Sequence, residues 1–117
     1  MFKSLLSVFR PYKYESRRIV FGQLFEKFEV YFLSTPMWNA PHSFTGKRIW
    51  IEKYFGEMAS KRLILTHRKD LNIGDFLVDD RICNGVENFS GTHIHFGSEK
   101  FPNWEVTFRY LINSHNN

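Results

Sequence analysis

The stretch EVYFLS, residues 29–34, is a largely apolar run of residues with high β-propensity, and it stops at Thr35 and Pro36. A run without regular polar alternation is typical of a strand that is buried on both faces, as the strands of a parallel sheet are. Further short apolar runs predict three more strands, at residues 62–66, 76–79 and 92–96. The four runs together predict one sheet of largely parallel strands.

Helical patterns lie before, between and after these runs. Apolar side chains recur at helical spacing within residues 15–28 and 47–55, and Pro102 stands where the first turn of a last helix is expected. Near the N-terminus, a short amphipathic helix ahead of Pro11 is predicted by four apolar residues at helical spacing: Phe2, Leu5, Leu6 and Phe9. Alternating helices and strands predict an α/β fold, an open and mostly parallel sheet with flanking helices.

The composition limits the class of protein. The chain has 117 residues, of which 43% are hydrophobic and 24% charged, which excludes a disordered or low-complexity protein. No apolar run approaches the roughly 18 residues that a membrane span needs. Cys83 is the single cysteine, and the first ten residues are too short and too charged for a secretory signal. We therefore expect one cytoplasmic domain, residues 1–117.

Charge is distributed unevenly along the chain. Residues 1–69 carry 13 Lys and Arg against 5 Asp and Glu, whereas residues 70–117 carry 3 against 7. A basic first half suits a nucleic acid, an anionic surface, or a fold that places phosphate-binding groups early and metal-binding carboxylates late. Because the positive charges are spread over predicted helices and loops, and no nucleic-acid motif is found, nucleic acid is the least favoured of these partners.

Polar residues follow three of the predicted strands at the points where those strands end. Ser34 and Thr35 close the first, Lys69 follows the second, and Asp79 and Asp80 close the third. Ligands of open parallel sheets bind beyond the carboxyl ends of the strands. Hydroxyl and ammonium groups bind phosphoryl oxygens, and carboxylates bind Mg²⁺. The set therefore predicts a site for a phosphate and a divalent metal ion.

Each member of this set also has a purely structural interpretation. Ser34 and Thr35 precede a proline and can simply turn the chain. Lys69 can be a solvated surface lysine, and the two aspartates can form an acidic turn with its own ion pair. Only the joint occurrence of these residues favours a site.

Three other reactive residues are not expected to carry chemistry. His93 and His95 alternate along a predicted strand and so share one face. Two histidines without a third ligand are weak grounds for a metal site, so a structural role is expected for both. Cys83 has no obvious catalytic partner and is not expected to act as a nucleophile.

Longer motifs span residues 29–111 in a fixed order: VYFLSTP (30–36), PHSFTGKRIWIEKYFG (41–56), RLILTHRK (62–69), GDFLVDDR (74–81) followed by Asn84 and Gly85, HFG (95–97) and FPNWE (101–105). In this order and at this spacing they resemble the 5'(3')-deoxyribonucleotidases of the haloacid dehalogenase (HAD) superfamily. The resemblance implies a Rossmann-like, HAD-type sheet of mostly parallel strands. It also implies Mg²⁺-dependent removal of phosphate from deoxyribonucleoside monophosphates.

The resemblance implies a role for each candidate site residue. Ser34 is similar to the hydroxyl that binds the transferred phosphoryl group, and Thr35 to its neighbour in the substrate pocket. Lys69 is similar to the lysine that offsets charge on the phosphate and the nucleophile. Asp79 and Asp80 resemble the family's acidic pair, with Asp80 as the preferred direct ligand of the metal.

One motif of the family has no counterpart in this chain. The family carries Asp-x-Asp at the end of an N-terminal strand, where the first Asp is the nucleophile and the second the general acid/base, but no Asp precedes Asp70 here. Residues 1–28 look like a remnant of the cap and of the helix before the matched core. We therefore expect the central strand, between those that end at Ser34 and Asp79, to be missing. Those two strands would then pair directly, accept a strand from a second copy or another partner, or leave the chain poorly stable.

These expectations predict a deoxyribonucleotidase-like chain that binds phosphate or a deoxyribonucleoside monophosphate with Mg²⁺. Without the Asp nucleophile, the chain is expected to be inactive alone, which leaves its assignment as an enzyme open. The alternative is a non-catalytic module that binds a nucleotide or phosphate, or that pairs with another protein. No association with a membrane is expected.

Overall fold

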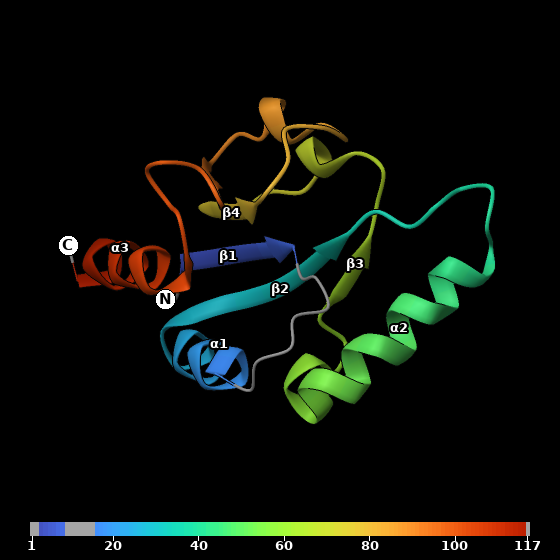
Figure 1. Cartoon of the computed structure of the whole chain (residues 1–117), viewed down its shortest axis with the longest axis horizontal. Helices are drawn as coiled ribbons and strands as arrows, with labels where there is room; N and C mark the ends of the chain where they lie inside the picture. The colour runs from blue at the N-terminus through green and yellow to red at the C-terminus, as the bar shows by residue number, and fades with distance from the viewer. Residues whose placement is uncertain (1–2, 9–15, 117) are drawn as a thin grey trace.

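The computed structural model describes residues 3–8 and 16–116. The strands in this part of the chain are β1 (Lys3–Val8), β2 (Phe28–Ser34), β3 (Leu63–Leu65), β4 (Phe76–Asp79) and β5 (Thr92–His95). They form one sheet in the order β3-β2-β1-β4-β5, and every neighbouring pair is parallel (Figure 1). The predicted α/β class and the parallel sheet are therefore confirmed.

In the described part of the chain, three helices and three short 3-10 turns lie between or after these strands. They are α1 (Ser16–Lys27), α2 (His42–Phe55), η1 (Gly56–Ala59), η2 (Lys69–Leu71), η3 (Val86–Asn88) and α3 (Trp104–Asn116). Within the described residues, none of these helices combines the length and the apolar character that crossing a membrane requires.

Successive side chains of β2 enter two separate apolar clusters, one on each face of the sheet. Val30 and Phe32 are fully buried in the larger cluster, which also contains side chains of all three helices. Leu33 is fully buried in the smaller cluster, together with Leu77 of β4 and Val86 of η3. Because neighbouring side chains of a strand point to opposite faces, apolar packing on both faces explains the continuous apolar run of β2.

Residues 3–8 form the central strand of the sheet, which corrects two expectations. β1 pairs with β2 from Lys3 opposite Phe28 to Val8 opposite Leu33, and it also pairs with β4. The predicted helix is therefore wrong for these residues, and so is the expectation of a missing central strand. Phe2 and Phe9, which belonged to the same helical pattern, lie outside the described residues.

The position of β1 in the sheet explains why its apolar pattern predicts a helix although the segment forms a strand. The apolar residues of a short run suit a helix or a strand equally well, so tertiary context decides between them. Between β2 and β4, a strand satisfies backbone N–H and C=O groups on both of its sides, which a helix in the same place leaves unpaired. Direct pairing of β2 with β4 is thus also wrong, and the sheet needs no strand from a partner.

Helix α2 begins at His42 instead of the predicted Lys47. The loop before it is fixed by Ser43, whose Oγ accepts a hydrogen bond from the Met37 amide at 3.0 Å and donates to the Met37 carbonyl at 3.1 Å. The helix continues through Gly46, although glycine is a weak helix former. The anchored start therefore outweighs the local preference of that residue.

Candidate active site

The carboxyl ends of the central strands lie at one edge of the sheet. β2 ends at Ser34 and β4 ends at Asp79, on either side of β1. The register brings these ends to the same level, because Ser7 of β1 lies opposite Phe32 of β2 and opposite Val78 of β4. Ser34 and Asp79 therefore lie at the edge where open parallel sheets bind ligands. Figure 1 shows the strands β2, β1 and β4 pointing toward this edge.

Lys69 and Asp79 form a buried ion pair at this edge. The Lys69 Nζ atom lies 2.7 Å from Asp79 Oδ2, and the two residues are only 4% and 1% exposed. Lys69 is held in place from the other side, because its amide donates to the Asn84 carbonyl at 2.7 Å. A solvated surface lysine, the structural interpretation of Lys69, is therefore wrong.

Ser34 and Thr35 connect the end of β2 to the chain that follows β3. Ser34 is 3% exposed, and its carbonyl accepts a hydrogen bond from the Thr66 amide at 3.0 Å. The Thr35 hydroxyl donates to the Thr66 carbonyl at 2.8 Å. Because a hydroxyl has a single proton to donate, this bond commits the donor of Thr35 to the protein, and the side chain positions the loop.

The two histidines of β5 hold the backbone of the acidic pair. The His93 Nε2 atom donates to the Asp79 carbonyl at 3.1 Å, and the His95 Nε2 atom donates to the Asp80 carbonyl at 3.2 Å. The two rings stack with centroids 5.5 Å apart and planes inclined by 25°. The expected shared face and structural role are confirmed. The sequence does not predict that both histidines hydrogen-bond to the backbone of the acidic pair. These bonds follow from the pairing of β4 with β5, which sets Asp79 opposite His95.

The two carboxylates of the acidic pair, Asp79 and Asp80, lie in different surroundings. Asp79 uses both oxygens within the protein, since Oδ2 accepts from Lys69 and Oδ1 accepts from the Arg81 amide at 2.9 Å. Asp80 follows immediately, and its Oδ1 atom is shielded from solvent. Within residues 3–8 and 16–116, no three or more His, Cys, Asp and Glu side chains come together as a metal site.

Arg68 and Asp70 flank Lys69 and pair with each other. The Arg68 guanidinium donates to both Asp70 oxygens, at 2.9 Å from Nε and 2.7 Å from Nη2. This hydrogen bonding holds the pKa of the Asp70 carboxyl below its usual value. The same Asp70 packs against Gly85, where any side chain would collide with Asp70 Oδ1, so the turn from 84 to 88 fits closely beside the segment that carries Lys69.

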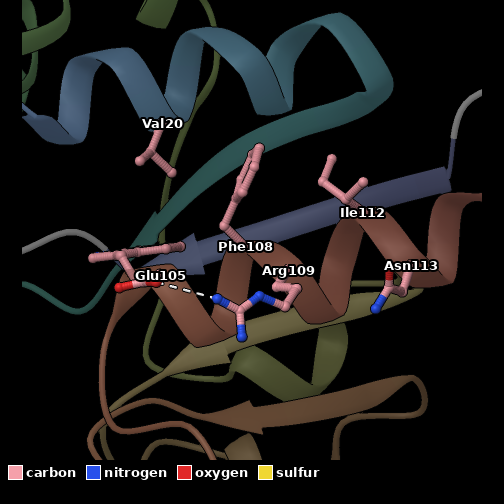
Figure 2. A pocket seen from close by; sticks show the side chains of 7 residues that line it. Val20, Glu105, Phe108, Arg109, Ile112 and Asn113 are labelled. Atoms are coloured by element: carbon pink, nitrogen blue, oxygen red, sulfur yellow. Dashed lines mark hydrogen bonds and ion pairs between the residues drawn. The ribbon is translucent and has the colours of Figure 1, made fainter.

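An apolar groove lies elsewhere, between α1 and α3 (Figure 2). Val20 of α1 faces Phe108 and Ile112 of α3 across it, and Glu105 pairs with Arg109 at its rim at 3.1 Å. None of the sequence-predicted site residues lines this groove. Cys83 is exposed, and the side-chain amide of Asn84 donates a hydrogen bond to its Sγ atom at 3.4 Å.

Comparisons with known proteins agree with this arrangement. The family described as 5' nucleotidase, deoxy (pyrimidine), cytosolic type C matches residues 4–113. A protein of Vibrio phage KVP40 named as a 5'(3')-deoxyribonucleotidase is 50% identical over 91 residues, which are 78% of this chain and 54% of that protein.

More distant relatives carry the same name. One from Bordetella bronchiseptica is 40% identical over 67 residues, 56% of this chain and 36% of the relative. The human cytosolic 5'(3')-deoxyribonucleotidase is 30% identical over 88 residues, 74% of this chain and 38% of the human protein. The chain thus spans about half the length of the phage relative and less of the others. Since the family match extends over nearly all of its residues, the chain belongs to the 5'(3')-deoxyribonucleotidase family of the HAD superfamily.

Proposed function

We propose that this chain carries the phosphate-binding and cation-binding part of a deoxyribonucleotidase site, and that its ligand is a deoxyribonucleoside monophosphate. The observation that carries the proposal is the buried pair of Lys69 and Asp79, with 2.7 Å between Nζ and Oδ2, at the sheet edge where β2 and β4 both end. An ammonium held by a buried carboxylate is oriented before the ligand arrives, which favours electrostatic stabilisation of a phosphoryl group. Ser34, the last residue of β2, supplies a hydroxyl at the same edge of the sheet.

The acidic pair can supply only part of the ligands that a magnesium ion needs. Both oxygens of Asp79 accept hydrogen bonds within the protein. Asp80 is the residue that the resemblance to the family favours as the direct ligand. Magnesium is commonly bound by one or two carboxylates together with substrate phosphate and several waters, without a complete protein cage. We therefore propose that Asp80 holds Mg²⁺ jointly with a bound phosphate, where the ion neutralises phosphoryl charge.

The same edge lacks an obvious nucleophile in the described residues. β1 occupies the place between Ser34 and Asp79, and its last residue is Val8, whose side chain has no nucleophilic atom. Hydrolysis through an aspartyl-phosphate needs a carboxylate at that position. We propose that the 117-residue chain binds its ligand without hydrolysing it. We also propose that it acts in the cytoplasm.

Calorimetric titration tests the binding part of this proposal. Titration with inorganic phosphate and with thymidine 5'-monophosphate, each with and without Mg²⁺, is expected to show binding that Mg²⁺ strengthens. Ser34→Ala is expected to weaken both ligands about 10-fold or more, because a hydrogen bond to a charged group contributes about 1.5–3 kcal/mol.

Ser90→Ala is the matched control and should bind like the wild type. It removes an exposed hydroxyl that precedes β5 and therefore does not lie at the carboxyl ends of β2 and β4. An absence of heat at millimolar concentrations of both ligands would contradict the proposal. So would a Ser34→Ala variant that binds as tightly as the Ser90→Ala control.

A further inference from the structure

The two peptide groups that flank the Cα atom of Asp80 are held by groups on β5 and just after it. The carbonyl of Asp79 accepts two hydrogen bonds, from His93 Nε2 at 3.1 Å and from the Phe96 amide at 3.0 Å. The carbonyl of Asp80 accepts from His95 Nε2 at 3.2 Å. Because a carbonyl oxygen can only accept, the Nε2 atom of each ring carries a proton.

These hydrogen bonds fix the direction in which the Asp80 side chain leaves the backbone. Each peptide group is planar, and the carbonyls of Asp79 and Asp80 belong to the two planes that meet at Asp80 Cα. The second plane is also held through its N–H, because the Arg81 amide donates to Asp79 Oδ1 at 2.9 Å. When both planes are fixed, the Cα–Cβ bond of Asp80 has one direction, and only its side-chain torsions remain free.

The two imidazole rings brace each other on one face of β5. Ile94, which lies between them in the sequence, is fully buried in the larger apolar cluster, so both rings lie on the opposite face of the sheet. The rings stack with centroids 5.5 Å apart and planes inclined by 25°. Stacking restricts the rotation of each ring, so the hydrogen bonds of His93 and His95 act together.

The two histidine bonds contribute more to local geometry than to the stability of the fold. Without His93, the Asp79 carbonyl keeps its hydrogen bond from the Phe96 amide. His95 is exposed, so water can take its place at the Asp80 carbonyl. A surface hydrogen bond that water can replace adds little to stability. What water does not supply is a fixed direction for the peptide group.

We propose that His93 and His95 are positioning residues, whose hydrogen bonds to the carbonyls of Asp79 and Asp80 orient the Asp80 carboxylate for a divalent cation. This inference rests on the proposed function, in which Asp80 holds Mg²⁺ jointly with a bound phosphate. Neither histidine contacts the ion in this role. Groups that orient a metal ligand commonly change the metal affinity by about 10- to 100-fold when they are removed.

Calorimetric titration with Mg²⁺ in the presence of inorganic phosphate tests the inference. His95→Ala is expected to bind Mg²⁺ about 10-fold more weakly than the wild type, or weaker still, because the peptide group after Asp80 loses its fixed direction. His93→Ala is expected to lose less affinity, since the Phe96 amide still holds the Asp79 carbonyl.

Titration with inorganic phosphate in the absence of Mg²⁺ separates positioning from a general loss of structure. His95→Ala should bind this phosphate as the wild type does, because Lys69 and Ser34 are the groups proposed to hold it. His95→Gln should recover most of the Mg²⁺ affinity, since the glutamine side chain supplies an N–H donor of similar reach. Thr92→Ala is the matched control: it removes an exposed side chain from the other end of β5 and should change neither affinity.

Four results would overturn the inference, and they differ in what else they affect. A His95→Ala variant that binds Mg²⁺ like the Thr92→Ala control would remove the positioning role while the proposed function stands. Equal losses of Mg²⁺ and phosphate affinity in His95→Ala would do the same, as would a His95→Gln variant no better than His95→Ala. Failure of the wild type to bind Mg²⁺ together with phosphate would overturn the proposed magnesium site, and the inference with it.

Discussion

Replacing Lys69 with methionine is expected to lower the free energy of unfolding by about 3–5 kcal/mol, because it leaves a buried charge without its partner. Asp79 is 1% exposed, and its Oδ2 atom has the Lys69 ammonium 2.7 Å away. Methionine is similar in length and fills the space, but it supplies no charge and no donor. Chemical denaturation of the purified variant at pH 7, monitored by circular dichroism, measures the change.

Two further variants distinguish a lost ion pair from a lost side chain. Lys69→Met combined with Asp79→Leu removes both charges and should recover much of the loss, since replacing a buried pair by apolar residues is often close to neutral. Lys27→Met removes an exposed lysine at the end of α1 and should change the stability by no more than about 0.5 kcal/mol. If Lys69→Met matched Lys27→Met, the pair would not be buried as described.

A proline at position 6 is expected to destabilise the chain by about 3 kcal/mol or more, enough to unfold much of the population. Leu6 lies in the middle of β1, opposite Tyr31 on one side and Leu77 on the other. A strand paired on both sides uses its amide groups in the ladders to its neighbours, and proline has no N–H to contribute. Differential scanning calorimetry of Leu6→Pro, together with urea denaturation, measures the effect.

Leu6→Val is the matched control for this substitution. Valine keeps the amide and has a high β-propensity, so a strand should tolerate it at a cost of about 0.5–1.5 kcal/mol or less. A Leu6→Pro variant whose unfolding midpoint equals that of Leu6→Val would contradict the central position of β1.

Much of the sheet follows from the sequence, because parallel strands buried on both faces leave a strong local signal. The strand predicted at 76–79 is the strand observed, and the run at 29–34 differs from β2 only in that Phe28 belongs to it. The last helix, expected from Pro102, begins at Trp104. Strands of this kind are continuous apolar runs bounded by polar residues, so the pattern and the structure coincide.

The N-terminal segment is less predictable from its own residues. Its apolar residues fit a helical spacing, and only the space between β2 and β4 makes it a strand. That space is a property of the whole sheet, and two other segments far along the chain create it. The family's first strand ends in Asp-x-Asp, and the absence of that motif before Asp70 predicts a gap where the structure has a strand.

The sequence likewise predicts one part of the candidate site and not the other. That Ser34 and Asp79 lie at one edge follows from the rule that parallel strands bind ligands at their carboxyl ends. The hydrogen bonds from His93 and His95 to the carbonyls of Asp79 and Asp80 depend on the register of β4 against β5, which apolar patterning does not specify. The hydrogen bond from the Lys69 amide to the Asn84 carbonyl likewise joins two segments whose pairing the local pattern does not specify.

A phosphatase assay on the purified chain tests the central proposal most directly, that the chain binds a deoxyribonucleoside monophosphate and that the residues described by the structure place no carboxylate to attack it. Release of phosphate from thymidine 5'-monophosphate is measured with Mg²⁺, at concentrations where titration shows binding, for the wild type and for Asp80→Asn. Loss of a nucleophile costs ~10⁴-fold or more in rate, so both proteins should release no more phosphate than a sample without protein. Release by the wild type that Asp80→Asn abolishes would contradict the account.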